Sequence, residues 1–157
     1  NCDWSSDVCS SDLATAELMF WYAKRFGNVD MPFAPEYIYS QINHGVDEGA
    51  YVEDALKLAT IQGVAPSAFY SGTLFSWWQI PNAAEISKAA LYRINGFEVI
   101  FSHANYTQGG ASAIEQTAIK KQLASGQPLI VTSFVDPSTF VPFDATTGVG
   151  KIGRAHV

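Results

Sequence analysis

Two residue types that together support covalent catalysis lie near the two ends of the chain. Cys9 lies in the stretch "SSDVCSSDL", and His156 lies in "KIGRAHV". A thiol becomes an effective nucleophile when a neighbouring imidazole accepts its proton. A cysteine and a histidine are therefore the pair that hydrolysis of a peptide bond by a thiol requires, provided that the fold brings them together.

The codons for these two stretches argue against a catalytic role. One codon set for Ser6 to Leu13 is TCA GAC GTG TGC TCT TCC GAT CT. Its reverse complement, preceded by one A, translates as KIGRAHV followed by a stop codon, which matches residues 151–157. Two unrelated termini have no reason to be encoded by opposite strands of one DNA word, and the word resembles a sequencing adapter. The alternative is a natural polar tail with a chance match.

We therefore interpret residues 1–13 and 151–157 as translated adapter around an interrupted gene, and we exclude them from reasoning about the fold. On this interpretation Cys9 and His156 are not catalytic, and both segments are expected to pack little against the rest of the protein. Codons for "SSDVCSSDL" in the genome itself would overturn it.

Composition narrows the possible functions of the whole chain. The 157 residues include 9 Lys and Arg against 15 Asp and Glu, with a net charge of −6. An acidic chain without a basic cluster argues against a nucleic-acid partner, because phosphate binding depends on Lys and Arg. Both cysteines lie in the adapter-like segment, so we expect no thiolate metal site and no cofactor. No apolar run approaches the roughly 20 residues that span a bilayer, and we expect no membrane span.

Apolar residues at helical spacing predict three helices in the first half of the chain, over 14–26, 34–43 and 50–62. In the first helix Leu18, Trp21, Tyr22 and Arg25 are expected to share one face. In the third, Leu56 and Ala59 share a face, and Gly63 is placed to end the helix in a left-handed conformation.

The second half mixes helical and extended patterns. Residues 65–81 are aromatic and irregular, and their rings are expected either in the core or lining a groove. Helices are predicted over 82–95 and 109–127, with strands at "GFEVIFS" (96–102) and "PLIVTSFV" (128–135) and a loop over 136–150. Helices followed by strands predict an α+β fold, with a helical lobe over 14–96 and the beginning of a sheet lobe over 97–150.

Four of these segments carry a resemblance to a known family. In order they are "ATAELMFWYAKRFGN", "APEYIYSQINHGVDEGAYVEDALKLATIQGVAP", "AALYRINGFEVIF" and "IKKQLASGQPLIVTSFV". Together they resemble the middle of a papain-like cysteine peptidase of the bacterial or archaeal type. The resemblance implies a truncated two-lobe fold, a parent enzyme that cleaves peptide or protein substrates, and a secreted or periplasmic location.

The same resemblance implies that the catalytic groups are missing from residues 14–150. The family places its cysteine at the start of the first helix, upstream of Ala14, and its histidine downstream of the second predicted strand. The chain itself is therefore expected to be inactive. One alternative is a non-catalytic relative that binds peptides or acts in adhesion, and the residue before Ala14 in the intact gene distinguishes the two. Another is an unrelated α+β domain.

The resemblance also implies a substrate-binding wall. Gly49 and Ala50 occupy the places of a Gly-Gly pair whose backbone pairs with an extended substrate. Alanine is tolerated at the second place only if its φ is negative. Tyr51 and Val52 correspond to the lining of the main specificity pocket, although packing at the helix N-terminus explains them equally well. Thr132 corresponds to the far wall of that pocket, with an ordinary strand position as the alternative.

Overall fold

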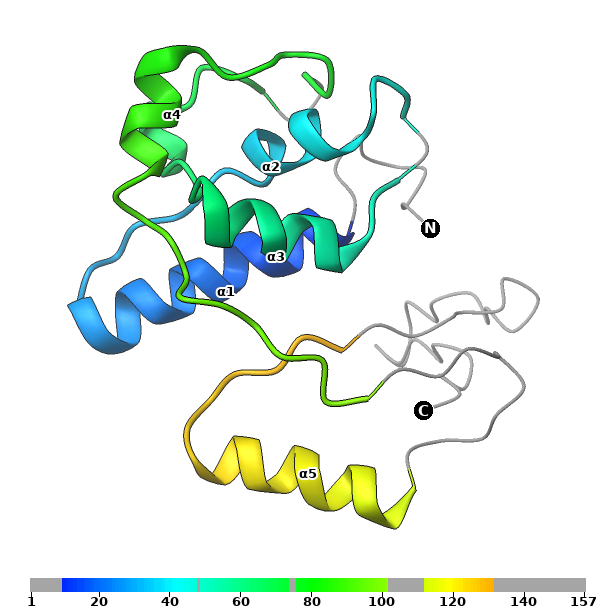
Figure 1. Ribbon diagram of the computed structural model, residues 1–157. Helices are drawn as coiled ribbons and strands as arrows, with labels where there is room; N and C mark the ends of the chain where they lie inside the picture. Colours follow the sequence, from blue (N-terminus) through cyan, green and yellow to red (C-terminus); the bar gives the residue numbers. More distant parts are fainter. Residues whose placement is uncertain (1–9, 48, 74–75, 102–111, 132–157) are drawn as a thin grey trace, which may run out of the picture. The chain divides into compact units, whose positions relative to one another are not determined.

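The computed structural model describes residues 10–47, 49–73, 76–101 and 112–131. The regular elements are α1 (Ser10–Gly27), α2 (Pro35–Ile42), α3 (Val52–Ile61), the short 3₁₀ helix η1 (Ser67–Phe69), α4 (Ala83–Ala89) and α5 (Ala113–Ala124) (Figure 1). The chain divides into two compact units, Asn1–Glu98 and Val99–Val157. We call them the helical unit and the C-terminal unit and describe each by itself.

α1 begins upstream of its predicted start at Ala14, within the segment interpreted as adapter. Ser11 and Asp12 are buried, and the Thr15 hydroxyl donates to the Ser11 carbonyl at 2.8 Å. Asp12 lies in the first turn, where a negative charge interacts favourably with the helix dipole. The expectation that residues 1–13 pack little is therefore wrong for Ser11 and Asp12, because the first turn of α1 lies inside the unit. Residues 1–9 and 151–157 lie outside the described residues.

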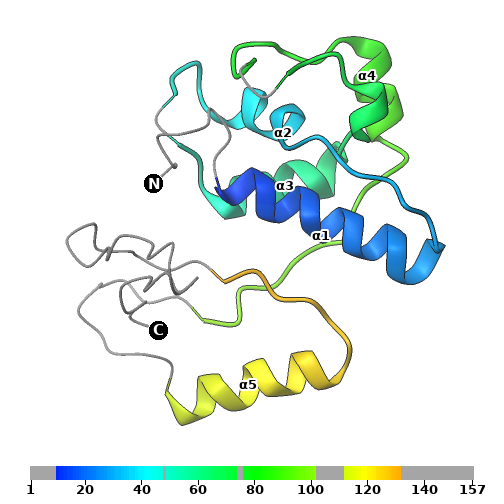
Figure 2. The same cartoon turned by 180° about the vertical axis from the view of Figure 1, so that it is seen from behind.

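The buried face of α1 also differs from the prediction. Ala16 and Met19 face the core, whereas the predicted face is only partly buried and Arg25 at its end is exposed. The large aromatic residues of α1 suggested the wrong face. Small residues such as Ala16 instead allow close approach of α2 and α3, and α1 packs against both of them (Figure 2).

The predictions for α2 and α3 are confirmed with small changes of their bounds. Pro35 begins α2, where its missing N–H costs nothing. Tyr37, Ile38 and Tyr39 are completely buried, so this short helix is the centre of the helical unit. α3 begins at Val52 rather than at residue 50, and Leu56 and Ala59 lie on its buried face as predicted.

Gly63 ends α3 in the predicted left-handed conformation, with a φ of +90°. Its backbone also approaches the end of α4: a Cβ atom at this position would lie 2.0 Å from the Ala89 carbonyl oxygen. The next residue, Val64, donates its N–H to the Tyr92 carbonyl at 3.0 Å. This glycine therefore permits the close contact between the C-terminal ends of α3 and α4.

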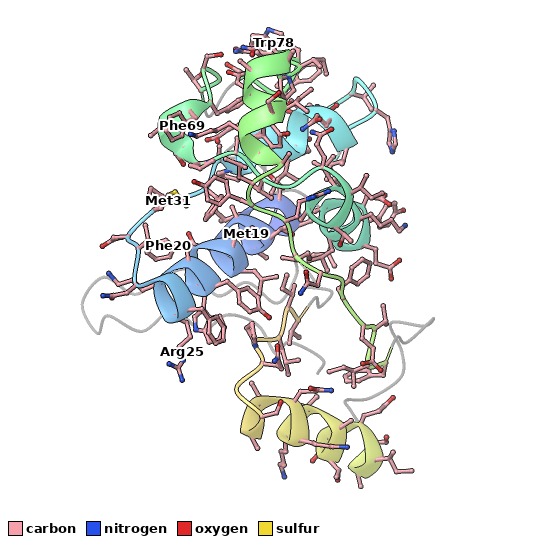
Figure 3. The ribbon with its side chains drawn as sticks, turned by 60° about the vertical axis from the view of Figure 1, so that its left-hand side comes forward. Met19, Phe20, Arg25, Met31, Phe69 and Trp78 are labelled. Carbon is pink, nitrogen blue, oxygen red and sulfur yellow. The ribbon has the colours of Figure 1, made fainter. Side chains whose placement is uncertain are left out.

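The segment between α3 and α4 is irregular, as predicted. An isolated antiparallel bridge joins Pro66 to Phe33, ahead of α2. Of the aromatic residues described here, Tyr70 is buried, while Phe69 and Trp78 are 50% and 63% exposed (Figure 3). The core interpretation is thus correct for Tyr70 and wrong for Phe69 and Trp78, while Trp77 is half-buried. α4 itself ends at Ala89, earlier than its predicted stretch.

The two predicted strands are not formed in the part of each that the structure describes, residues 96–101 and 128–131. Phe97, Val99 and Phe101 alternate as a strand would, but all three are at least 36% exposed. Alternation predicts one apolar face, whereas a strand also needs a hydrogen-bonded neighbour. The regular elements of the described residues are therefore all helices. The sheet lobe that we expect over residues 97–150 stays a prediction.

Within the C-terminal unit, the helix predicted over 109–127 is confirmed as α5, with narrower bounds. Its N-cap is Ser112, whose hydroxyl accepts the Glu115 N–H at 3.3 Å while the Glu115 carboxylate accepts the Ser112 N–H at 2.6 Å. Gly126 follows the helix with a φ of +79°, as expected for a left-handed ending.

Candidate functional site

The predicted substrate-binding residues on the helical unit lie between a polar loop and the start of α3. We call residues 49–51 the ledge. Gly49 has a φ of +98°, which favours glycine, and Ala50 is not among the residues with positive φ. The condition for alanine at the second place is therefore met. Tyr51 is extended, with φ −88° and ψ 140°, and forms the N-cap of α3.

A buried tyrosine of α2 supports the ledge from beneath. The Tyr39 hydroxyl donates to the Asp47 carboxylate and accepts the Gly49 N–H at 3.3 Å. Tyr39 has no solvent exposure, so its ring is fixed in the core of the unit. The Tyr39 hydroxyl therefore binds Asp47 and Gly49 at the same time and attaches the start of the ledge to α2.

Asn43, one turn after Tyr39, holds the preceding loop and a second segment. Its side-chain oxygen accepts the Gly45 N–H at 2.9 Å, and its carbonyl accepts the Val46 N–H at 3.1 Å. Its side-chain amide donates to the Trp77 carbonyl at 2.7 Å. The loop before the ledge and the segment around Trp77 are therefore both attached to the C-terminal end of α2.

The ledge presents its aromatic side chain to solvent. Tyr51 is 80% exposed and so packs little at the helix N-terminus, whereas Val52 is half-buried. The Gly49 N–H is already donated to Tyr39, and the Tyr51 carbonyl already accepts the Asp54 and Ala55 N–H groups, so neither of these two backbone groups of the ledge is left to pair with a peptide. Thr132, like Cys9 and His156, lies outside the described residues.

The helical unit contains a buried carboxylate, Glu85, that the sequence analysis does not predict. Glu85 accepts from the Ser71 N–H, the Ser71 hydroxyl and the Asn82 N–H, each at 2.8 Å. Burial raises the pKa of Glu85, but these three hydrogen bonds outweigh it and hold the pKa below its usual value. The signal in the sequence is Asn82 followed three residues later by Glu85, which is a capping box.

A second polar cluster joins α2 to the end of α3. The Gln62 side-chain amide donates to the Tyr37 hydroxyl and to the Gln41 side-chain oxygen, both at 2.6 Å. Burial raises the pKa of the Tyr37 hydroxyl, although the hydrogen bonds with the two glutamines act in the opposite direction. These side chains satisfy one another's hydrogen bonds, and we assign them a role in stability.

The described part of the chain contains no group of three or more His, Cys, Asp or Glu side chains placed to hold a metal ion. Among the same residues, no helix is both long and apolar enough to cross a bilayer. The two exposed ion pairs, Lys24–Asp30 at 3.2 Å and Lys57–Asp54 at 3.1 Å, contribute little to stability.

Comparison with known proteins gives one structural likeness. No protein-family model and no curated protein matches the chain. The crystal structure of xylellain, a cysteine protease from Xylella fastidiosa, is similar with a TM-score of 0.49 and 16% sequence identity. The similarity covers 54% of this chain and 38% of xylellain, so the chain spans well under half of that protein. A likeness of this size is too low to establish a shared fold.

Proposed function

We propose that this chain is the middle part of a papain-like cysteine peptidase and that the ledge is part of its peptide-binding wall. The observation that carries the proposal is the ledge itself. A left-handed glycine held by a buried tyrosine leads into an extended residue, Tyr51, whose side chain is 80% exposed. The four ordered sequence segments support the same family.

The ledge has the properties that recognition of an extended peptide requires. An extended stretch can pair its backbone with a peptide by strand addition, while side chains beside it select residues of the substrate. Because Gly49 is tied to the core through Tyr39, little conformational entropy has to be lost on binding. Tyr51 offers a large aromatic surface for a substrate side chain.

Catalysis in the parent enzyme would require a thiol at the start of α1. A helix N-terminus stabilises a thiolate and lowers the pKa of a cysteine. In this chain the first turn of α1 lies inside the unit, but its residues Ser11 and Asp12 belong to the segment that we attribute to the adapter. Cys9 precedes this turn, but we attribute it to the adapter, so the purified chain is expected to lack peptidase activity. Sustained hydrolysis that a thiol-directed inhibitor blocks would contradict this expectation.

The genomic locus across both junctions provides the first test. A cysteine followed by an apolar stretch just upstream of Ala14, together with a Gly-His pair downstream of Gly150, would support a peptidase. Another residue in the cysteine's place would favour the alternative, a non-catalytic relative that binds peptides. Genomic codons continuing into "SSDVCSSDL" would refute the adapter interpretation and restore Cys9 and His156 as candidates.

Peptide binding by the purified chain provides the second test. The probe is reduced, alkylated, fluorescein-labelled casein, followed by fluorescence anisotropy. Tyr51→Ala should weaken binding about tenfold, because it removes an exposed aromatic contact. Phe69→Ala removes another exposed aromatic ring, which contacts Lys88 of α4, and should leave binding unchanged. Equal affinities for all three proteins, or no binding by the unmodified chain, would count against the ledge as a peptide site.

A further inference from the structure

We propose that Tyr39 is the positioning residue of the ledge, and that its hydroxyl sets the affinity for peptide by fixing the turn at Gly49. This inference rests on the proposed function, because it assigns a role to a residue that does not itself touch the peptide. The observation that carries it is the double use of one buried hydroxyl, which donates to Asp47 and accepts from Gly49 at 3.3 Å.

The tyrosine belongs to the fully buried part of the helical unit. Its side chain is completely buried in α2, and its helical neighbours Tyr37 and Ile38 are also completely buried. The hydroxyl therefore has a fixed position from which to hold a loop. The loop itself is polar, and Asp47 at its surface is exposed. The order of the ledge thus comes from α2 rather than from packing of the loop.

The geometry of Gly49 explains why the turn needs a hold. A residue with a φ of +98° occupies a region that glycine visits freely and leaves freely. The hydrogen bond from the Gly49 N–H to Tyr39 selects this one conformation and so directs residues 50 and 51 toward α3. Asn43 secures the beginning of the same loop through Gly45 and Val46. Removal of the Tyr39 hydroxyl would leave the hydrogen bonds of Asn43 with Gly45 and Val46 intact and would release Gly49.

Tyr39→Phe removes the hydroxyl and keeps the ring in the core. It should weaken binding of the labelled casein about tenfold and accelerate hydrogen exchange of the Gly49 amide by a similar factor. Tyr70→Phe is the matched control. Tyr70 is also a buried tyrosine, and its hydroxyl donates to the Gln79 carbonyl at 2.8 Å. The control should lower the melting temperature comparably but leave casein binding and Gly49 exchange unchanged.

Two variants of Asp47 separate the hydrogen bond from the charge. Asp47→Asn keeps a side-chain oxygen that can accept from Tyr39, so its affinity for casein should remain close to that of the unmodified chain. Asp47→Ala removes this acceptor but leaves the Tyr39 hydroxyl in place to accept the Gly49 N–H, so it should weaken casein binding less than Tyr39→Phe does. If Tyr39→Phe binds casein as tightly as the unmodified chain, the positioning role is refuted while the peptide site stands. If the unmodified chain does not bind casein, the proposed function fails, and the positioning role fails with it.

Discussion

Substitution of Gly63 tests the close contact between the C-terminal ends of α3 and α4. In Gly63→Ala the new methyl group would meet the Ala89 carbonyl oxygen at 2.0 Å and the Tyr92 carbonyl oxygen at 2.7 Å. These are backbone atoms, so a side-chain rotation cannot relieve the overlap. The ends of α3 and α4 must separate, and the Val64–Tyr92 and Ile94–Ala59 backbone hydrogen bonds would break with them.

The cost can be worked out from three contributions. An alanine in the left-handed region costs about 1–2 kcal/mol. Two lost backbone hydrogen bonds cost about 1 kcal/mol each. Partial exposure of Val64, which is completely buried, adds about 1 kcal/mol. The free energy of unfolding should therefore fall by about 4–5 kcal/mol, a large share of the stability of an ordinary domain.

Gly45→Ala is a matched control in the same unit. Gly45 has a φ of +80°, and a Cβ atom there would meet nothing within 4 Å. Its cost should be limited to the backbone strain of about 1–2 kcal/mol. Urea unfolding followed by far-ultraviolet circular dichroism measures both variants. If the two lose the same stability within about 0.5 kcal/mol, the close approach of α3 and α4 at Gly63 is wrong.

Two further predictions concern the polar contacts of α4. Folding lowers the pKa of Glu85 below its usual 4.5, so its ionised form stabilises the fold above that pH, and this contribution is lost as the pH falls through the lower folded-state pKa. Glu85→Gln should therefore lower the free energy of unfolding near neutral pH by about 1–3 kcal/mol. It should also reduce the fall of the melting temperature below about pH 4.5. A melting temperature that falls with pH as steeply as that of the unmodified chain would contradict this. Asn82→Ala removes the side-chain oxygen that accepts the Ala84 and Glu85 N–H groups at 2.9 and 3.1 Å, and should cost about 1 kcal/mol in urea unfolding, whereas Asn82→Asp should retain most of the stability.

The local order of the helices could be predicted from the sequence because it depends on local signals. Pro35 at the start of α2 and Gly63 after α3 each mark a boundary by their own backbone preferences, and both predictions are confirmed. The buried face of α1 could not be predicted in the same way. Spacing identifies a set of possible faces, but which face is buried depends on neighbours that come later in the chain. In the structure the buried face of α1 is the one that carries Ala16 and Met19.

The candidate site shows a similar division. Glycine permits the left-handed conformation of Gly49 without requiring it, so the residue type alone could not predict that conformation. The exposure of Tyr51 shows that its ring does not pack in the core, and its role in peptide binding stays a prediction. The role of Tyr39 could not be predicted, since an aromatic residue in an apolar helix is typical of a core. Its hydroxyl acquires a function only because the loop folds back to within hydrogen-bonding distance.

At the start of α1, the interpretation of the codons and the burial of the side chains conflict. The codons relate residues 6–13 to residues 151–157, which suggests that Asp12 is foreign to the protein, yet Asp12 is completely buried. Packing of this turn weakens the adapter interpretation, and the genomic sequence across the junction decides between the two. Two opposing effects act on the Asp12 carboxylate: burial removes it from water, and the helix dipole favours a negative charge in the first turn. The genomic sequence upstream of Ala14 identifies the native residue, and urea unfolding of the variant that restores it measures which of the two effects is larger.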